Sequence, residues 1–261
     1  MLEGFGVLTV RELKKWLKAP FPALGLFVGP IVWVFIFGNA LNSAFFGQGT
    51  GSASLLGSPD YFNFLATGMA VNMTTTYASR SGGSLFTDRF TGYLYRLLSS
   101  PASRATIVVS KILAGTILSL VQALVLLLMS LPLGLDASRL TPVSAVLFAV
   151  TLVLLSMGFS ASFVVLSLRT RRWQSQQLVG PLVVTPLSFL STVFYPASRL
   201  PPVLQGLVLI NPLSYAADAA RALFFQPSPW LSATFQISML SLVAFVVAAF
   251  AVLTLTYRRW L

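Results

Sequence analysis

Long uncharged stretches alternate with short charged clusters along the whole chain. The charge-free stretches cover residues 19–59, 61–79, 112–135, 140–168, 173–198 and 222–257. A helix that crosses the hydrocarbon core of a membrane needs about 20 predominantly apolar residues, and each stretch can supply them. The pattern therefore predicts six spanning helices, near 21–41, 61–79, 112–133, 142–168, 177–195 and 231–256. We expect an all-α integral membrane protein in which residues 1–261 form a single transmembrane domain.

Helix-start signals stand before three of these spans. Ser or Thr precedes Pro at positions 58–59, 141–142 and 228–229. A hydroxyl N-cap followed by Pro in the first helical position is a common way to begin a helix. We expect these pairs to open the second, fourth and sixth spans.

The composition requires apolar surface in contact with lipid. Hydrophobic residues make up 56% and charged residues 9%, and the mean hydropathy is +0.83. A soluble domain has roughly 25% charged residues, so this chain has too few polar groups to cover its surface. The chain contains neither Cys nor His, which excludes disulfides, Cys/His metal sites and His-based catalysis. We expect no metal site.

The basic residues gather on one predicted side of the membrane. The net charge is +11, from 17 basic and 6 acidic residues. On a soluble protein such an excess would suggest nucleic acid, which we do not expect here. With six spans, the termini and the segments 80–111 and 169–176 share a side that holds 14 of the 17 basic residues. The positive-inside rule then places both termini in the cytoplasm.

The N-terminal segment 1–20 has the pattern of an amphipathic helix. At 100° per residue, one face carries Leu2, Gly6, Val10, Leu13 and Leu17, and the other carries Arg11, Lys14, Lys15 and Lys18. Such a helix lies in the plane of the membrane interface. The alternative is a basic flank that only orients the chain. The apolar span that follows is too long for a cleaved signal peptide, so we expect it to be retained.

The cytoplasmic segment 80–111 mixes apolar and charged residues at nearly helical spacing over 85–98, and a Ser-Ser-Pro sequence at 99–101 ends this part. Its apolar members are Phe86, Phe90, Tyr93, Leu94, Leu97 and Leu98. A connecting loop would not leave them in water. They dock on the membrane surface, or they fill a groove of a partner as an amphipathic helix does.

Four segments, in this order, resemble those of ABC-2 type export permeases, the membrane subunits of ATP-driven exporters of drugs, lipids and polysaccharides. They read DYFNFLATG at 60–68, RFTGYLYRLLSSPASR at 89–104, FYPASRLP at 194–201 and LINPLSY at 209–215, the last followed by Asp218 and Arg221. The resemblance covers nearly the whole chain and is closest to the drug- and lipid-exporter branch.

The resemblance implies a role for each end of the molecule. The segment 80–111 would hold a coupling helix seated on an ATP-binding subunit, through Phe86, Asp88, Arg89, Tyr93, Arg96, Leu97 and Leu98. The interfacial helix would contact the same subunit through Arg11, Lys14, Lys15 and Trp16. Two ATP-binding cassette subunits, carrying the ATP and Mg, would serve a dimer of permeases, the second one identical to the first. The complex would lie in the cytoplasmic membrane of a bacterium or archaeon.

The resemblance also implies that 196–229 forms a re-entrant pair of short helices on the external side. Independently, Asn211 before Pro212 predicts a helix over 212–225. Asp218 and Arg221 lie three residues apart on this helix and can form an ion pair. A paired charge enters the membrane at lower cost than a single one. The alternative is an external loop helix with a weak surface ion pair.

The chain carries no ATP-binding machinery of its own. No G-x-x-x-x-G-K-[ST] motif occurs, and no Lys follows a Gly. No acidic residue lies well inside a span, so there is no carboxylate pair or intramembrane proton carrier. We expect a transport subunit that is not an enzyme and binds no cofactor.

Two spans carry residues with candidate roles in transport. In the second span, Asn63, Thr67, Asn72 and Thr75 either allow close helix packing or line a path. In the fifth span, Gly180, Pro181 and Pro186 weaken the helix and mark a candidate hinge or gate.

Three functions remain open from the sequence. The first is an exporter of an amphipathic drug or lipid, because the chain has few charges with which to hold an anionic polymer. The second is a polysaccharide or glycolipid permease of the same family. The third is a secondary carrier or channel without an ATPase, for which an internal repeat would argue. No repeat relates the two halves.

Overall fold

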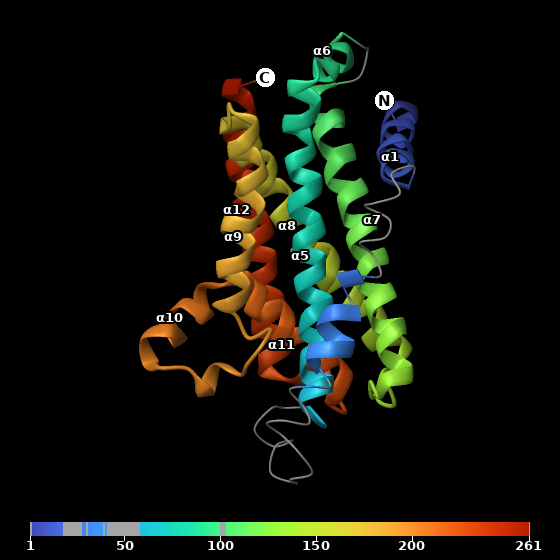
Figure 1. Cartoon of the computed structure of the whole chain (residues 1–261), viewed down its shortest axis with the longest axis vertical. Coiled ribbons are helices and arrows are strands. Elements are labelled where there is room, and N and C mark those ends of the chain that lie inside the picture. The colour runs from blue at the N-terminus through green and yellow to red at the C-terminus, as the bar shows by residue number, and fades with distance from the viewer. Residues whose placement is uncertain are drawn as a thin grey trace.

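The computed structural model describes residues 2–17, 28–29, 31–38, 40, 58–99 and 103–260, and these residues form helices and turns without any strand (Figure 1). The expected all-α class is confirmed for this part of the chain. The elements are α1 (Leu2–Leu17), η1 (Ile31–Gly38), α5 (Tyr61–Phe90), α6 (Tyr93–Leu98), α7 (Arg104–Ser130), η2 (Leu131–Leu133), α8 (Pro142–Arg169), α9 (Trp173–Phe189), η3 (Ala197–Arg199), α10 (Pro202–Ile210), α11 (Pro212–Phe225), η4 (Pro229–Leu231) and α12 (Ala233–Trp260).

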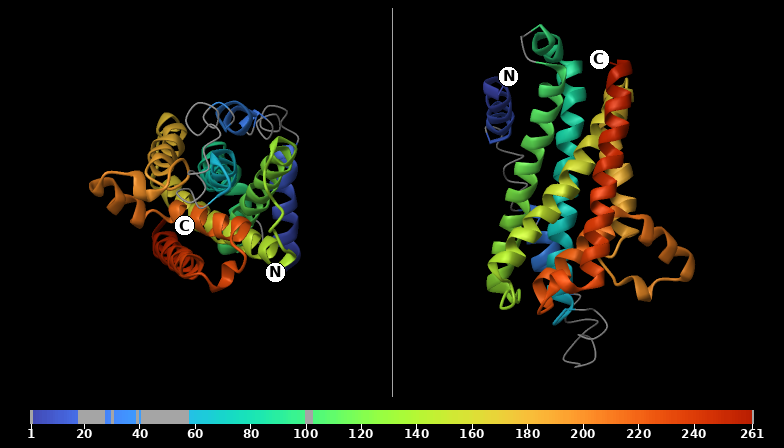
Figure 2. Two further views of the ribbon diagram at one scale, coloured as in Figure 1. Left: turned by 90° about the horizontal axis from the view of Figure 1, so that it is seen from below. Right: turned by 180° about the vertical axis from the view of Figure 1, so that it is seen from behind.

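Helix α5 lies in the middle of the bundle and packs against α7, α8, α9 and α11 (Figure 2). Nearly all of its side chains from Tyr61 to Ser79 are buried. At Gly82 the backbone of α8 comes so near that a Cβ atom would lie 2.5 Å from the carbonyl oxygen of Ser160. Glycine is therefore required for this close contact, which holds the second half of α5 against α8.

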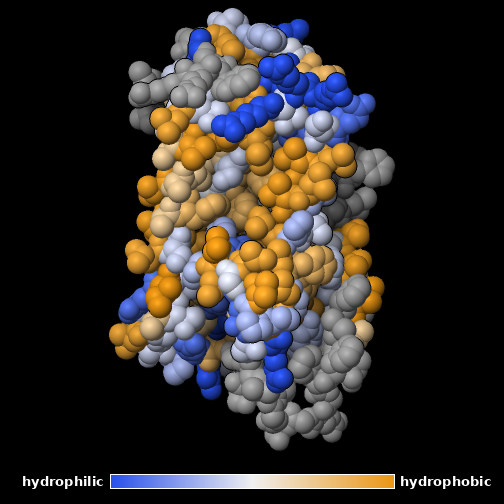
Figure 3. Space-filling model, turned by 90° about the vertical axis from the view of Figure 1, so that its left-hand side faces the viewer, coloured by the Kyte–Doolittle hydropathy of each residue, from blue (hydrophilic) through white to orange (hydrophobic). Residues whose placement is uncertain are grey.

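The two ends of the bundle differ in what they carry. Helices α1 and α6 and the C-terminal end of α12 lie at one end, called the α6 end below. Helix α10 and the connection between α7 and α8 lie at the other, called the α10 end (Figures 1 and 2). On the face shown in Figure 3, hydrophobic residues cover most of the middle and hydrophilic residues gather towards the ends.

Within the described residues, three helices are long and apolar enough to cross a membrane: Arg104–Leu133, Pro142–Arg169 and Ala233–Thr256. They correspond to the third, fourth and sixth predicted spans. Of the first predicted span, residues 21–27, 30, 39 and 41 lie outside the described residues, and η1 occupies 31–38. The six-span topology therefore stays a prediction.

The helix that carries the second predicted span is longer than the span itself. Helix α5 does not end near residue 79 but continues to Phe90, so the segment 80–111 is mostly helix rather than loop. Contacts of its polar residues explain the continuation, because Ser81 Oγ donates a hydrogen bond to the carbonyl oxygen of Lys111 at 2.8 Å. The turn to α6 comes at Gly92, where φ is 75°, a conformation that glycine adopts without strain.

Two of the three predicted helix starts are wrong in position. Asp60, not Ser58, caps α5, and its carboxylate accepts a hydrogen bond from Asn63 N at 2.7 Å. Ser228 precedes only the short η4. Helix α12 starts at Ala233, where Ser232 Oγ accepts from Phe235 N at 3.2 Å. The cap at Thr141 is confirmed.

The helix that carries the fifth predicted span is shorter than expected at its end, because α9 stops at Phe189 rather than near 195. Asn211 Nδ2 donates hydrogen bonds to the carbonyl oxygens of Leu187 and Leu190, both at 2.7 Å. It thereby supplies donors for carbonyl groups at the end of α9, where the helix itself offers none. The same side chain accepts a hydrogen bond from Leu213 N at 3.0 Å and caps α11. The helix predicted over 212–225 is confirmed as α11.

Candidate functional site

A cavity of about 610 Å³ lies between α5 and α9, with one residue of α8 in its wall. It occupies the half of the bundle nearer the α6 end, since its α5 residues run from Thr76 to Thr87. The lining residues are Thr76, Ser79, Arg80, Gly83, Ser84, Thr87, Phe163, Trp173, Gln176, Gln177, Gly180, Pro181, Val184 and Thr185.

The lining combines uncharged polar groups with apolar surface. Hydroxyl and amide side chains come from both helices, while Phe163, Trp173, Pro181 and Val184 supply the apolar part. Arg80 is the one charged residue of this lining. Sites of this size hold drug-sized ligands, with apolar walls for the body and a few polar groups for orientation. The lining therefore suits a molecule with an apolar body and a polar head.

The polar residues predicted to line a path lie elsewhere. Asn63, Thr67, Asn72 and Thr75 are all buried between helices and face no part of the cavity. Asn63 Oδ1 accepts a hydrogen bond from Asp136 N at 2.7 Å. The hydroxyl groups of Thr67 and Thr75 each donate a hydrogen bond to a carbonyl oxygen of their own helix. In this conformation the four support the packing alternative, and Thr76 and Ser79, further along α5, face the cavity instead.

The predicted hinge residues lie on a lightly packed helix. Pro181 and Pro186 both stand inside α9, which buries only Val184 and Ser188. Gly180 and Pro181 form part of the cavity wall, and Pro186 does not. Their action as a hinge stays a prediction.

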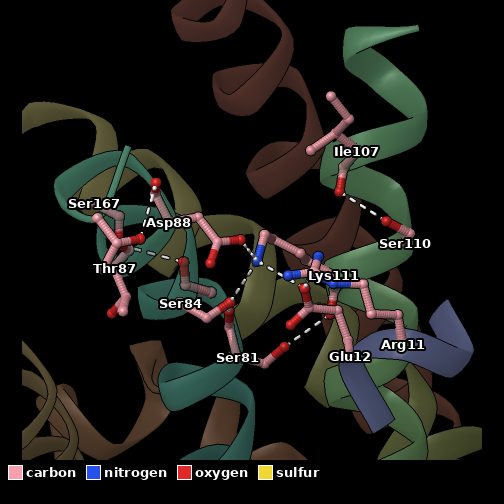
Figure 4. A network of polar contacts seen from close by, with 12 residues as sticks. Arg11, Glu12, Ser81, Ser84, Thr87, Asp88, Ile107, Ser110, Lys111 and Ser167 are labelled. Carbon is pink, nitrogen blue, oxygen red and sulfur yellow. Dashed lines mark hydrogen bonds and ion pairs between the residues drawn. The ribbon is translucent and has the colours of Figure 1, made fainter. Parts of the chain in front are cut away.

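Beside the cavity, four charged side chains form a network that joins three helices (Figure 4). Lys111 of α7 points between α5 and α1, with its Nζ atom 2.6 Å from Asp88 Oδ2 and 3.4 Å from Glu12 Oε1. Lys111 Nζ also donates to Ser84 Oγ at 3.1 Å, and Ser84 lines the cavity. Arg11 Nη1 lies 3.3 Å from Glu12 Oε1. Two acids and two bases thus balance one another.

The sequence reasoning missed Lys111, Glu12 and Ser84. A signal was present, because Lys111 is a single charge directly before the third apolar span and needs an anionic partner when buried. Asp88, expected to meet the ATP-binding subunit, is 2% exposed and paired with Lys111. It therefore anchors α5 to α7 rather than standing at a surface.

The predicted coupling residues divide into a buried and an exposed set. Phe86, Leu94 and Leu97 are buried inside the chain, so neither a membrane surface nor a partner groove is needed to shield them. The surface of this end is made by others: Phe90 and Tyr95 are 62% and 67% exposed. Arg96 is exposed and Leu98 is half-buried.

Two further contacts fix this end. Arg89 Nη1 donates to the carbonyl oxygen of Leu168 at 3.1 Å, and Arg89 Nη2 donates to that of Thr170, which caps the end of α8. Arg11 of the N-terminal helix lies over the ring of Tyr93, 3.8 Å from its centre. Helix α1 therefore touches α6.

Helix α1 packs against α7, and its Val10 is 48% exposed. Lys14 is exposed as well. The buried side includes Thr9, which is 8% exposed. The side chains of Lys15 and Trp16 lie outside the described residues.

The predicted ion pair at the α10 end is confirmed, with Arg221 Nη1 3.2 Å from Asp218 Oδ1. It is not a surface pair, because the Arg221 side chain is 7% exposed. Arg221 Nη2 donates to the carbonyl oxygens of Thr192 and Val193 at 2.7 and 3.1 Å. The guanidinium also lies 3.5 Å from the centre of the Phe64 ring. Arg221 thus joins α11, α5 and the turn after α9.

The comparison with family models decides the relationship of this chain. A model described as ABC-2 type transporter matches residues 3–225. The chain belongs to the ABC-2 type transporter family. Permeases of this family work with ATP-binding subunits. The residues that the sequence predicted for coupling and the cavity described above all lie inside the matched range.

Individual relatives are transport permeases. The chain is 33% identical to the transport permease ycf38 of Porphyra purpurea over 214 residues, 81% of this chain and 70% of that protein. It is 26% identical to the inner membrane transport permease YadH of Escherichia coli K12, over 90% of this chain and 87% of that protein. It is 25% identical to the daunorubicin resistance ABC transporter permease protein DrrB1 of Streptomyces coeruleorubidus, over 95% and 83%.

Proposed function

We propose that this chain is the membrane subunit of an ATP-driven exporter and that it moves an amphipathic drug or lipid-like molecule through the cavity between α5 and α9. The observation that carries this proposal is the lining of the cavity, which combines amide and hydroxyl groups with the apolar side chains of Phe163, Trp173 and Val184. Such a lining suits a molecule with two unlike ends better than a uniformly polar saccharide. The name of the Streptomyces relative, a daunorubicin resistance permease, supports the same class.

The proposed setting is the cytoplasmic membrane, crossed six times with the α6 end inside. The distribution of charge supports this orientation, because Arg96, Arg104 and Arg172 belong to the α6 end and the positive-inside rule places such residues in the cytoplasm. The inner membrane relative from Escherichia coli supports the location. Helices α10 and α11 then form the external, re-entrant segment.

The proposed partners are two ATP-binding cassette subunits, which hold the ATP and Mg, and a second, identical permease. The ATP-binding subunit would dock on the surface made by Phe90, Tyr95 and Arg96, next to α1. The second permease would lie along α9, whose Leu178 and Leu182 are 56% and 68% exposed. A partner there would close the cavity from the side that α9 forms.

The buried ion network supplies a route from this docking surface to the cavity. A movement of α6 relative to α1 pulls on Glu12 and Asp88 together, because both hold Lys111. Ser84 connects the same ammonium group to the cavity wall. Rigid helices joined by such a network can pass a displacement on to α5.

The deciding experiment is purification of the full chain from its native membranes in a mild detergent, followed by identification of co-purifying chains and an ATPase assay. An ATP-hydrolysing subunit at near-equal stoichiometry, stimulated by amphiphiles, is the expected result. A chain that stays alone without ATPase activity would instead favour a secondary carrier or channel. Stimulation by oligosaccharides and not by amphiphiles would favour the polysaccharide branch.

A further inference from the structure

The charged residue of the cavity lining and those of the adjoining connection between α8 and α9 are all basic. Arg80 stands in the wall with its guanidinium 5.4 Å from the centre of the Tyr77 ring. No carboxylate lies within 4 Å of it among the described side chains. At the connection between α8 and α9, Arg171 and Arg172 are exposed and directly precede the lining residue Trp173.

The nearby acids are already neutralised. Asp88 is buried against Lys111, and Glu12 is paired with both Lys111 and Arg11. Of the other acids whose side chains the structure describes, Asp60 and Asp136 belong to the α10 end, and Asp218 is paired with Arg221. The cavity therefore has a positive potential without a compensating anion of the protein.

With the second predicted span starting at Tyr61, Arg80 is expected at the level of the lipid head groups on the other side of the membrane. Arg80 lies nineteen positions after Tyr61 on α5, which corresponds to about 28 Å along the helix axis. The hydrocarbon core is about 30 Å thick. An arginine at this height faces the boundary between chains and head groups, while Phe163 and Val184 provide apolar surface for a tail.

We propose that the cavity selects an anionic amphiphile, and that Arg80 binds its phosphate, sulfate or carboxylate head. This inference rests on the proposed function, since it specifies the head group of the molecule that the cavity is proposed to take. The guanidinium is planar and presents paired donors to such oxyanions.

The test uses the absence of cysteine from the natural chain. A single Gln177→Cys substitution places a thiol on an exposed position of the lining. The full chain is purified in an uncharged maltoside detergent, and the rate of maleimide labelling is measured with three probes of equal tail length. These are dodecyl phosphate, dodecylphosphocholine and dodecyltrimethylammonium. A Leu231→Cys variant, whose thiol lies at the α10 end, controls for general effects of the probes on labelling.

Dodecyl phosphate is expected to protect Gln177→Cys at a concentration about tenfold lower than dodecyltrimethylammonium, a preference of the size that one charge-assisted hydrogen bond provides. Arg80→Gln in the same background removes the preference, and Arg80→Lys keeps most of it. Arg171→Gln changes the electrostatic field around the cavity but not its lining. It is expected to alter the preference for dodecyl phosphate less than twofold. Inorganic phosphate, which has no tail, protects only at far higher concentration.

The outcomes separate the inference from the proposed function. Equal protection by all three amphiphiles, in the natural lining and in Arg80→Gln, would overturn the anionic selectivity and leave the amphiphile cavity standing. No protection by any amphiphile would overturn both. Equal protection by inorganic phosphate and dodecyl phosphate would show a site for free anions and overturn the amphiphile. If Arg80→Gln fails to fold, the relative protection by the three amphiphiles in the protein that keeps Arg80 still decides whether the cavity prefers an anion.

Discussion

The Nζ atom of Lys111 lies 2.6 Å from Oδ2 of Asp88, and each of these side chains is 2% exposed. The pair joins the first third of α7 to the last turn of α5, which leads into α6. A buried charge without its partner is far more costly than a buried pair, so each residue makes the other necessary. The pair therefore fixes the position of the α6 end relative to the bundle.

Lys111→Met should destabilise the protein by about 3 kcal/mol, because it leaves Asp88 buried and unpaired. Thermal unfolding in detergent measures the loss. The double variant Lys111→Met with Asp88→Leu should recover most of it, since no buried charge then remains. Additive losses in this double-mutant cycle would contradict a direct interaction between the two residues. Glu12→Gln should cost less, because Glu12 is 12% exposed and more distant at 3.4 Å.

Tyr95→Ala should abolish the association with an ATP-binding subunit while leaving stability within roughly 0.5 kcal/mol, the usual range for an exposed position. Tyr95 is 67% exposed on α6. Co-purification and substrate-stimulated ATPase activity are the readouts, and Trp230→Ala, an exposed aromatic at the α10 end, is the matched control. Full activity of the Tyr95 variant would place the docking surface elsewhere.

Leu97→Ala should act differently from Tyr95→Ala, although both residues lie on α6. Leu97 is 7% exposed, so its truncation should remove about 2–3 kcal/mol of stability by leaving a cavity. A loss of coupling in this variant would therefore reflect the fold of the α6 end as well as contact with a partner. Comparing its thermal midpoint with that of Tyr95→Ala separates the two causes.

Gly82→Ala should destabilise the contact of α5 with α8 by about 1–3 kcal/mol, the usual cost of overpacking. A Cβ atom there would lie 2.5 Å from the carbonyl oxygen of Ser160 and 2.7 Å from Cβ of Phe163, a lining residue. The neighbouring Gly83→Ala is the control. Its Cβ would meet only the end of the Gln176 side chain, at 3.0 Å. Thermal unfolding of both variants tests the prediction, and equal stabilities would refute it.

Arg221→Lys should loosen the turn after α9 although it keeps the charge. A lysine cannot donate at the same time to Asp218 and to the carbonyl oxygens of Thr192 and Val193, as the guanidinium does. Faster hydrogen exchange over residues 190–196 is the expected observation. Asp218→Asn should have a smaller effect, because the Asp218 side chain is 35% exposed. Unchanged hydrogen exchange in Arg221→Lys would mean that the turn is stable without the hydrogen bonds of Arg221.

The pattern of local features predicted much of this fold. The helix over 212–225 followed from Asn211 before Pro212, since a cap and a first-turn proline are short-range signals that act wherever the chain lies. The ion pair of Asp218 and Arg221 followed from their spacing of three residues. The charge-free stretches located α7, α8 and α12 because lipid demands apolar side chains over a fixed length.

Interactions between distant parts of the chain decided the rest. The charge of Arg80 ended the second predicted span near residue 79, yet Gly82 packs on α8 and the helix continues to Phe90. The burial of Phe86 and Leu97, and the pairing of Asp88 with Lys111, depend on where α7 and α8 lie. The sequence alone determined that this is a helical membrane protein, because composition and local caps act without knowledge of neighbours, and four of its segments resemble those of ABC-2 permeases. Only the tertiary structure decided that Thr76 and Ser79 face a cavity while Asn72 and Thr75 do not. Residues a few positions apart point to different sides of a helix, so the placement of the neighbouring helices decides what each of them contacts.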